Sequence, residues 1–94
     1  MLFRSYQAFV TAASLGSFTK AAEKLNYTQS AISRMISDLE SEWHMSLLER
    51  RKTGVSLTSD GLKLLPYAKE LCEKQKALQM QVDALSGQIG RAHV

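Results

Sequence analysis

Residues 17–43 have the sequence SFTKAAEKLNYTQSAISRMISDLESEW, which contains two helical patterns separated by a short polar turn. The first pattern covers 18–25, and Ser17 before it is a favourable N-cap. The second pattern covers 29–43, and Thr28 can cap it in the same way. Two helices joined by so tight a turn predict a helix-turn-helix motif.

The helix predicted at 29–43 has an apolar and a polar face. Its apolar residues recur at three- and four-residue steps, so we expect them to be buried. They are Ile32, Met35, Ile36, Leu39 and Trp43. The polar face carries small hydroxyl side chains around one arginine, namely Ser30, Ser33, Arg34 and Ser37. Because these serines are short, this face can approach a ligand closely.

A further helix precedes this motif and a hairpin follows it. Apolar residues at helical spacing predict a helix over 2–14. Two short extended runs, Leu47–Arg50 and Val55–Thr58, flank a basic tip and predict a β-hairpin. The three-helix core and the hairpin predict a mainly α fold, a winged helix-turn-helix domain over 1–58, with its helix-turn-helix at about 18–37.

One long helix is predicted over 59–88, with Thr58 or Ser59 as its N-cap. Apolar residues recur on it in a heptad pattern for about three and a half heptads, which is typical of a coiled-coil seam. The predicted seam consists of Leu64, Ala68, Leu71, Gln75, Leu78, Val82 and Leu85, followed by Ile89. A small three-helix core cannot cover so long a seam, so we expect this linker helix to form a homodimer.

The composition argues against an enzyme and against a metal protein. The chain has 94 residues, two histidines and one cysteine, Cys72, which are too few for a zinc site or an internal disulfide. We identify no phosphate-binding glycine loop and no nucleophile beside a base, so we predict no enzymatic activity, no metal and no cofactor. The net charge of +3 is compatible with a nucleic-acid partner without proving one. No apolar run approaches the roughly 18 residues of a membrane span and no signal sequence opens the chain, so we expect a cytoplasmic location.

Several of these motifs together resemble one family, the LysR-type transcriptional regulators. The resemblance begins with GSFTKAAEKL at 16–25 and continues with YTQSAISR at 27–34. It extends through LLER at 47–50 and through Gly61 at the start of the long helix. The resemblance implies sequence-specific binding of double-stranded DNA by a transcriptional regulator that acts as a dimer.

At two places the sequence departs from the usual pattern of that family. Leu48 stands where phenylalanine is usual, and Trp43-His44 replaces a common Leu-Gly. A glycine at the second place would suit a left-handed helix cap, which histidine tolerates less well. We expect these differences to affect packing near the hairpin and not the surface that faces DNA.

The resemblance and the side-chain chemistry imply that the third helix enters the major groove. Gln29 can pair with adenine, and Arg34 can reach guanine or a thymine oxygen. The predicted DNA-contacting residues are Lys20, Thr28, Gln29, Ser30, Ser33, Arg34, Arg51 and Lys52. The basic hairpin tip is expected along the DNA backbone or in the minor groove of A·T-rich DNA. Because a dimer presents two such helices, the predicted site is an interrupted inverted repeat with A·T-rich flanks.

Some of these polar residues could have a role that does not involve DNA. Arg34 could pair with Asp38 one helical turn later, and Lys20 could be an ordinary exposed lysine. We expect Arg50 to pair with Glu49 or with a carboxylate of the third helix, and therefore rank it below the two basic residues that follow it. The alternative function is a protein-interaction module that dimerises through the long helix.

The resemblance also bears on the end of the chain. Members of this family carry a small-molecule-sensing domain after the linker helix, whereas this chain has 94 residues. We therefore expect the C-terminal effector-sensing domain, and with it any small-molecule effector, to be missing here. The last residues, 89–94, resemble a translated sequencing adapter, and we expect them not to belong to the natural protein.

Overall fold

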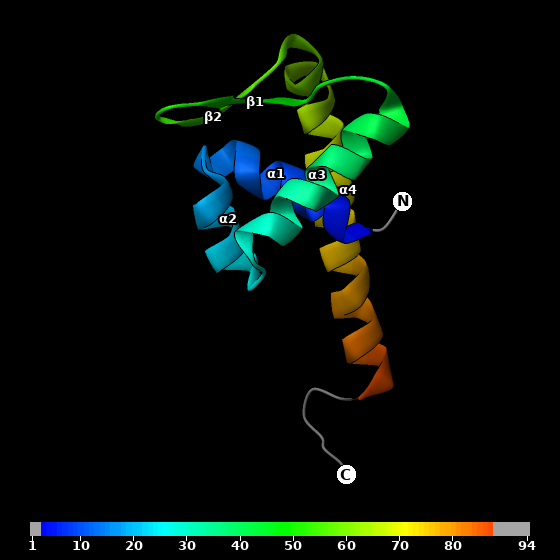
Figure 1. Ribbon diagram of the computed structural model, residues 1–94. Coiled ribbons are helices and arrows are strands. Elements are labelled where there is room, and N and C mark those ends of the chain that lie inside the picture. The colour runs from blue at the N-terminus through cyan, green and yellow to red at the C-terminus, as the bar shows by residue number, and fades with distance from the viewer. Residues whose placement is uncertain (1–2, 88–94) are drawn as a thin grey trace.

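The computed structural model describes residues 3–87, which form helices and one β-hairpin (Figure 1). The elements are α1 (Phe3–Leu15), α2 (Phe18–Leu25), α3 (Gln29–Trp43), β1 (Leu48–Arg51), β2 (Gly54–Leu57) and α4 (Ser59–Ser86). The predicted mainly α fold, with a winged helix-turn-helix and a long last helix, is confirmed. The helix starting point at residue 2 and the tail 89–94 lie outside the described residues. α4 ends at Ser86, two residues before the predicted end, because Gly87 takes the left-handed conformation of a C-cap.

Polar caps determine where the helices begin and end. The Ser17 hydroxyl accepts a hydrogen bond from the Lys20 backbone N–H at 3.1 Å, and Thr28 accepts one from the Ala31 N–H at 3.1 Å. Between them Asn26 takes a left-handed conformation with φ of 65°, which ends α2 and turns the chain into α3. Both N-caps were predicted from the sequence, and α2 and α3 occupy the predicted residues.

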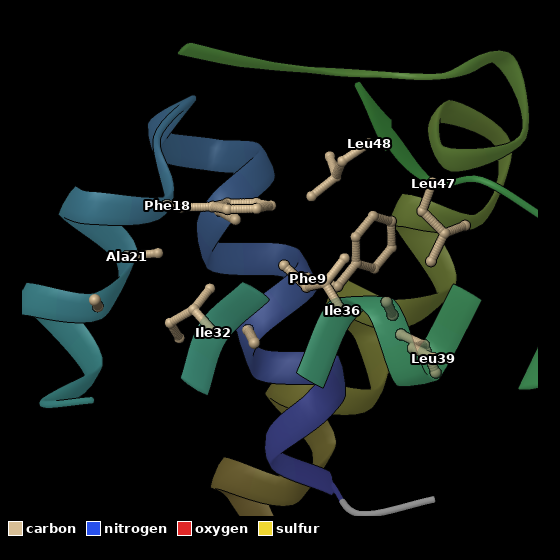
Figure 2. Packing of buried hydrophobic residues seen from close by; sticks show 12 residues of the cluster. Phe9, Phe18, Ala21, Ile32, Ile36, Leu39, Leu47 and Leu48 are labelled. Carbon is tan, nitrogen blue, oxygen red and sulfur yellow. The ribbon is translucent and has the colours of Figure 1, made fainter. Parts of the chain in front are cut away.

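The core lies where the first three helices pack against one another and where α1 packs against the start of α4 (Figure 2). Its largest fully buried side chains are Phe9, Ile32, Leu39 and Leu47. Met35 and Trp43, which we expected in the core, are only half-buried and pack against it. The Trp43 ring stacks on Tyr6 of α1 with ring centroids 6.1 Å apart, so it covers the edge of the core.

The wing is the β1–β2 hairpin, and hydrogen bonds from backbone N–H groups in it and just before it attach it to the helices at two places. The Val55 backbone N–H donates to the Gly16 carbonyl at 2.9 Å, which joins β2 to the turn between α1 and α2. A Glu40 carboxylate oxygen of α3 accepts from the backbone N–H groups of Leu47 at 2.6 Å and Leu48 at 3.1 Å. A two-stranded hairpin is marginally stable alone, so these contacts set the position of the wing.

The strands of the wing differ from the predicted ones by one residue. β1 covers Leu48–Arg51 and β2 covers Gly54–Leu57, where 47–50 and 55–58 were expected. The backbone at Gly54 has a φ of 140°, and a Cβ there would lie 2.3 Å from the Gly16 carbonyl oxygen. Because glycine has no Cβ, residue 54 can lie beside the Gly16 carbonyl as the first residue of β2. The pairing of the two strands therefore extends to Arg51 and Gly54, one residue closer to the hairpin turn than the side-chain pattern predicts.

His44 ends α3 in the left-handed conformation, with φ of 56° and ψ of 43°. Its backbone N–H reaches back to the carbonyls of Glu40 and Ser41. The structure thus confirms that a histidine occupies a cap position at which glycine is less strained.

α4 extends well beyond the core, and Figure 1 shows its second half projecting away from the other helices. Ala68 is its last buried residue. Beyond it the helix exposes large apolar side chains, namely Leu71, Leu78, Met80, Val82 and Leu85. Within residues 3–87, no helix is both long and apolar enough to cross a membrane.

Candidate nucleic-acid interface

The polar face of α3 is open to solvent at its N-terminal half. Gln29, Ser30 and Arg34 are exposed, and Ser33 is half-buried between them and the wing. On the opposite side Ile32 is fully buried, so the helix cannot rotate without exposing the core. A shallow hollow is lined by Gln29, Ser30, Ser33, Arg34, Ser37, Asp38 and Arg50. The predicted polar residues of α3 therefore share one accessible surface.

Arg34 is free to bind a ligand. Its side chain is 83% exposed, and its Nε lies 4.0 Å from a carboxylate oxygen of Asp38, itself 63% exposed. An exposed ion pair between residues one helical turn apart stabilises a helix by only about 0.3–0.5 kcal/mol. The pairing with Asp38 that we considered is present, but it is too weak to hold the guanidinium away from another partner.

Arg50 contacts both helices of the helix-turn-helix and, among the described residues, pairs with no carboxylate. The expected pairing with Glu49 or with a carboxylate of α3 is wrong. One guanidinium nitrogen of Arg50 instead donates a hydrogen bond to the Ser33 hydroxyl of α3. The guanidinium carbon lies 4.4 Å from the centroid of the Phe18 ring, at the start of α2. Arg50 therefore joins the wing to both helices of the helix-turn-helix.

The carboxylate of Glu49 pairs with Arg51 on the other face of the wing. The Arg51 guanidinium lies 2.9 Å from Glu49 and donates through Nε to the Ser56 hydroxyl at 2.7 Å. Lys52 follows at the exposed tip of the hairpin. Of the two wing cations predicted to contact DNA, Arg51 thus already has partners within the wing, although its side chain is 61% exposed.

Lys20 and Thr28 lie at the edges of the polar face. The Lys20 side chain is exposed in the first turn of α2, where the backbone N–H groups of a helix favour anions. Thr28 is exposed, and its hydroxyl oxygen already accepts the capping bond of α3. That hydroxyl still has its proton to donate, as contact with a phosphate would require.

A second hollow lies where the wing meets the start of α2. It is lined by Ser17, Phe18, Thr19, Gln29, Arg50, Arg51, Lys52, Gly54 and Val55. Because Gln29 and Arg50 line both hollows, the surface is continuous from α3 to the wing tip. Six of the eight predicted DNA-contacting residues line these two hollows, namely Gln29, Ser30, Ser33, Arg34, Arg51 and Lys52. The other two, Lys20 and Thr28, lie at the starts of α2 and α3 beside them.

Strand alternation could have identified Arg50. Leu48 is buried, and residues two apart on a strand point to the same face. Arg50 is therefore directed toward the helices, while Glu49 and Arg51 point away from them. The decisive partner, Ser33, is seventeen residues distant in the chain, so no local pattern indicates that contact.

The predicted dimerisation residues fall into two groups. Ala68 is 4% exposed and Leu64 packs against the same cluster, so both contribute to the core of their own chain. The remaining seam residues, Leu71, Gln75, Leu78, Val82 and Leu85, are exposed. Within the predicted seam, the part that is exposed to a second copy therefore begins at Leu71.

Cys72 lies beside this surface and is half-buried. Burial raises the pKa of its thiol above the ordinary value of 9.0, and the negative charge of Glu73 raises it further. A raised pKa keeps the thiol protonated and unreactive near neutral pH. Within residues 3–87, no group of three or more His, Cys, Asp or Glu residues is placed to hold a metal ion.

Residues 3–62 match the model of the lysR family of bacterial regulatory helix-turn-helix proteins. The chain belongs to the LysR family. Over 70 residues, or 74% of the chain, it is 46% identical to the uncharacterized HTH-type transcriptional regulator YbhD of Escherichia coli strain K12. This LysR-family chain spans only 22% of YbhD, and 29–30% of two other curated relatives that it matches.

Solved structures of LysR-family DNA-binding domains have the same fold. The structure of a CbnR_DBD–DNA complex matches 92% of this chain and 99% of the solved chain, with a TM-score of 0.80 and 30% identity. A BenM_DBD complex with benA site 1 DNA matches 90% of this chain and 99% of the solved chain, with a TM-score of 0.80 and 34% identity. Both proteins were solved bound to DNA.

Proposed function

We propose that this chain binds double-stranded DNA sequence-specifically, as the DNA-binding part of a transcriptional regulator. The observation that carries this proposal is the exposed polar face of α3, with Gln29, Ser30 and Arg34 beside a basic wing. The DNA complexes of similar folds support it. In this arrangement α3 enters the major groove, and the wing meets the minor groove or the backbone.

Two residues of α3 are suited to contact base edges. Gln29, the first residue of the helix, can pair with adenine, and Arg34 can pair with guanine or a thymine oxygen. Thr28, Ser30 and Ser33 are placed to donate to phosphate or base acceptors. Lys20, Arg51 and Lys52 would contact phosphates or A·T-rich minor grooves on either side.

The same proposal assigns dimerisation to α4. Residues 1–58 form the DNA-binding domain, and the helix that begins at residue 59 links two copies through the seam from Leu71 to Leu85. Two copies would present two α3 helices to one side of DNA, about one helical turn apart. The expected site is an interrupted inverted repeat with A·T-rich flanks, and the expected compartment is the cytoplasm.

Selection from a random duplex library, followed by fluorescence anisotropy at two salt concentrations, tests the proposal. The wild type should enrich an inverted repeat and bind it with a steep salt dependence. Arg34→Ala should weaken binding to the enriched duplex by roughly 5- to 150-fold, because a good bidentate base contact contributes about 1–3 kcal/mol. Lys76→Ala is the matched control, since it removes one exposed positive charge from α4, away from the polar face. It should change binding by less than about twofold.

The alternative, a protein-interaction module, predicts a different outcome. The library would show no enrichment, and weak binding would be the same for the wild type and for Arg34→Ala. The exposed face of α3 favours DNA, because it carries hydroxyls, a glutamine and an arginine where a protein interface centre is usually apolar or aromatic.

A further inference from the structure

We infer that Arg50 is a positioning residue for DNA recognition: it fixes the wing against the helix-turn-helix and holds the Ser33 hydroxyl in a donor orientation. The inference rests on the proposed function. It concerns a residue outside the predicted DNA-contacting set, and a coupling between two residues on different elements.

The contacts of Arg50 connect three elements. Its guanidinium lies 4.4 Å from the centroid of the Phe18 ring and donates to Ser33. Phe18 is only 7% exposed and belongs to the core, so its ring is a fixed platform and not a mobile surface group. A cation over such a ring is stabilised by the ring quadrupole. The planar guanidinium can stack on the ring and donate in its own plane at the same time, which lysine cannot do.

Because Arg50 lies in the middle of the hairpin, its contacts help to set the direction of the hairpin tip. Arg50 pairs with Val55 across the hairpin, and the Val55 N–H is bonded to Gly16. The middle of the hairpin is thus held on both strands, by a backbone bond on β2 and by a side chain on β1. Arg51 and Lys52 follow immediately, so their direction toward DNA depends on this point.

The bond to Ser33 also determines what Ser33 can offer to DNA. A serine hydroxyl has one proton to donate and two lone pairs that accept. Because the Ser33 oxygen accepts from a positively charged guanidinium, its own proton is directed away from Arg50. Polarisation by the charge makes that O–H a better donor. Ser33 is therefore set to donate to acceptors, such as guanine O6 or N7, thymine O4 or a phosphate oxygen.

Arg50 remains accessible while it makes these contacts. It is exposed and lines the same hollow as Gln29, Ser33 and Arg34. Arginine carries five N–H donors, so one bond to Ser33 leaves others to face a bound duplex. The contact can therefore persist in the complex and does not need to break when DNA binds.

The test is a double-mutant cycle on the 94-residue protein, with the duplex enriched by the wild type and a scrambled duplex of equal length. The variants are Arg50→Lys, Ser33→Ala and the two combined. Arg50→Lys keeps the charge, so the salt slope should not change. Each single change should lower the ratio of specific to non-specific affinity by roughly three- to tenfold. In the double variant this ratio should be no more than about twofold below that of the single variant with the lower ratio.

Arg51→Lys is the comparison on the outer face of the wing. It keeps the charge, and Arg51 donates to Glu49 and Ser56 and not to Ser33, so any loss that it causes should multiply with the loss from Ser33→Ala. Melting temperatures of all variants should lie within about 4 °C of the wild type, which shows that they fold.

Two results would overturn the inference while leaving DNA binding intact. One is an Arg50→Lys variant with the wild-type affinity ratio. The other is a double variant in which the two losses multiply, because Arg50 and Ser33 would then act independently. Failure of the wild type itself to enrich any duplex would overturn the proposed function, and this inference with it.

Discussion

Leu78 and Met80 provide a matched pair for testing the proposed homodimer. Both are exposed on the projecting part of α4, to 62% and 61% respectively. They lie two residues apart and therefore about 200° around the helix from each other. Leu78 belongs to the heptad seam, whereas Met80 lies outside it. Alanine at either position should weaken the dimer only if that side of the helix is buried by the partner.

The exposed fractions set the expected magnitude. Full burial of a leucine side chain stabilises by about 1.5–3 kcal/mol, so burial of the exposed 62% of Leu78 is worth roughly 1–2 kcal/mol per copy. A symmetric dimer buries two copies, so Leu78→Ala should remove roughly 2–4 kcal/mol. This loss corresponds to a dissociation constant raised by roughly 30- to 1000-fold. Met80→Ala should change it by less than about twofold, since most exposed substitutions stay within about 0.5 kcal/mol.

Sedimentation equilibrium over a range of protein concentrations measures these constants. Alanine is a good helix former at both positions, so any gain in the helicity of the monomer is the same for both variants. The reasoning is refuted if the two variants weaken the dimer equally, if Met80→Ala has the larger effect, or if the wild type is monomeric at every concentration. Leu78→Ala should also bind a single half-site as the wild type does, while it loses tight binding to the complete inverted repeat.

Three further predictions concern stability. Glu40→Ala should lower the free energy of unfolding by roughly 2–4 kcal/mol, because two part-buried N–H groups at the start of the wing lose their acceptor; Glu42→Ala is the exposed control in the same urea titration, and equal losses would contradict the capping role. His44→Gly should raise the free energy of unfolding by about 1 kcal/mol, since it relieves the left-handed backbone; an unchanged urea midpoint would contradict this. The raised pKa of Cys72 means that the unfolded thiol ionises first, so its contribution to stability is complete below pH 9.0 and is lost as the pH rises toward the native pKa. As the pH rises above 9.0, the stability of Cys72→Ala should therefore fall less than that of the wild type. If the melting temperatures of the two proteins fall in parallel with rising pH, the effect is excluded.

Most of the fold follows from local patterns in the sequence. Caps such as Ser17 and Thr28 act within one helical turn, so the residues beside them suffice to place a helix start. The apolar stripe of α3 and the heptads of α4 are also local periodicities, which predict the buried and exposed faces. The polar face that carries the proposed function can therefore be predicted from the sequence alone.

The hairpin was less predictable, for a reason that lies outside it. Side-chain alternation placed its strands one residue away from their true positions. The register depends on Gly54 passing beside the Gly16 carbonyl, and on Glu40 accepting from the N–H groups of Leu47 and Leu48. These contacts join segments far apart in the chain, and propensity carries no information about them.

The same distinction separates the two kinds of site residue. Gln29 and Arg34 could be assigned from the sequence, because their exposure depends only on which face of one helix is apolar. The role of Arg50 depends on Phe18 and Ser33, which the chain brings to it only when α2, α3 and the wing pack together. Likewise, the heptad pattern marks Ala68 and Leu71 alike, but the length of the core that α1 provides leaves only the second exposed. Local hydrogen bonds and periodicity are encoded over a few residues, whereas the partner of an exposed arginine is determined by packing across the whole domain.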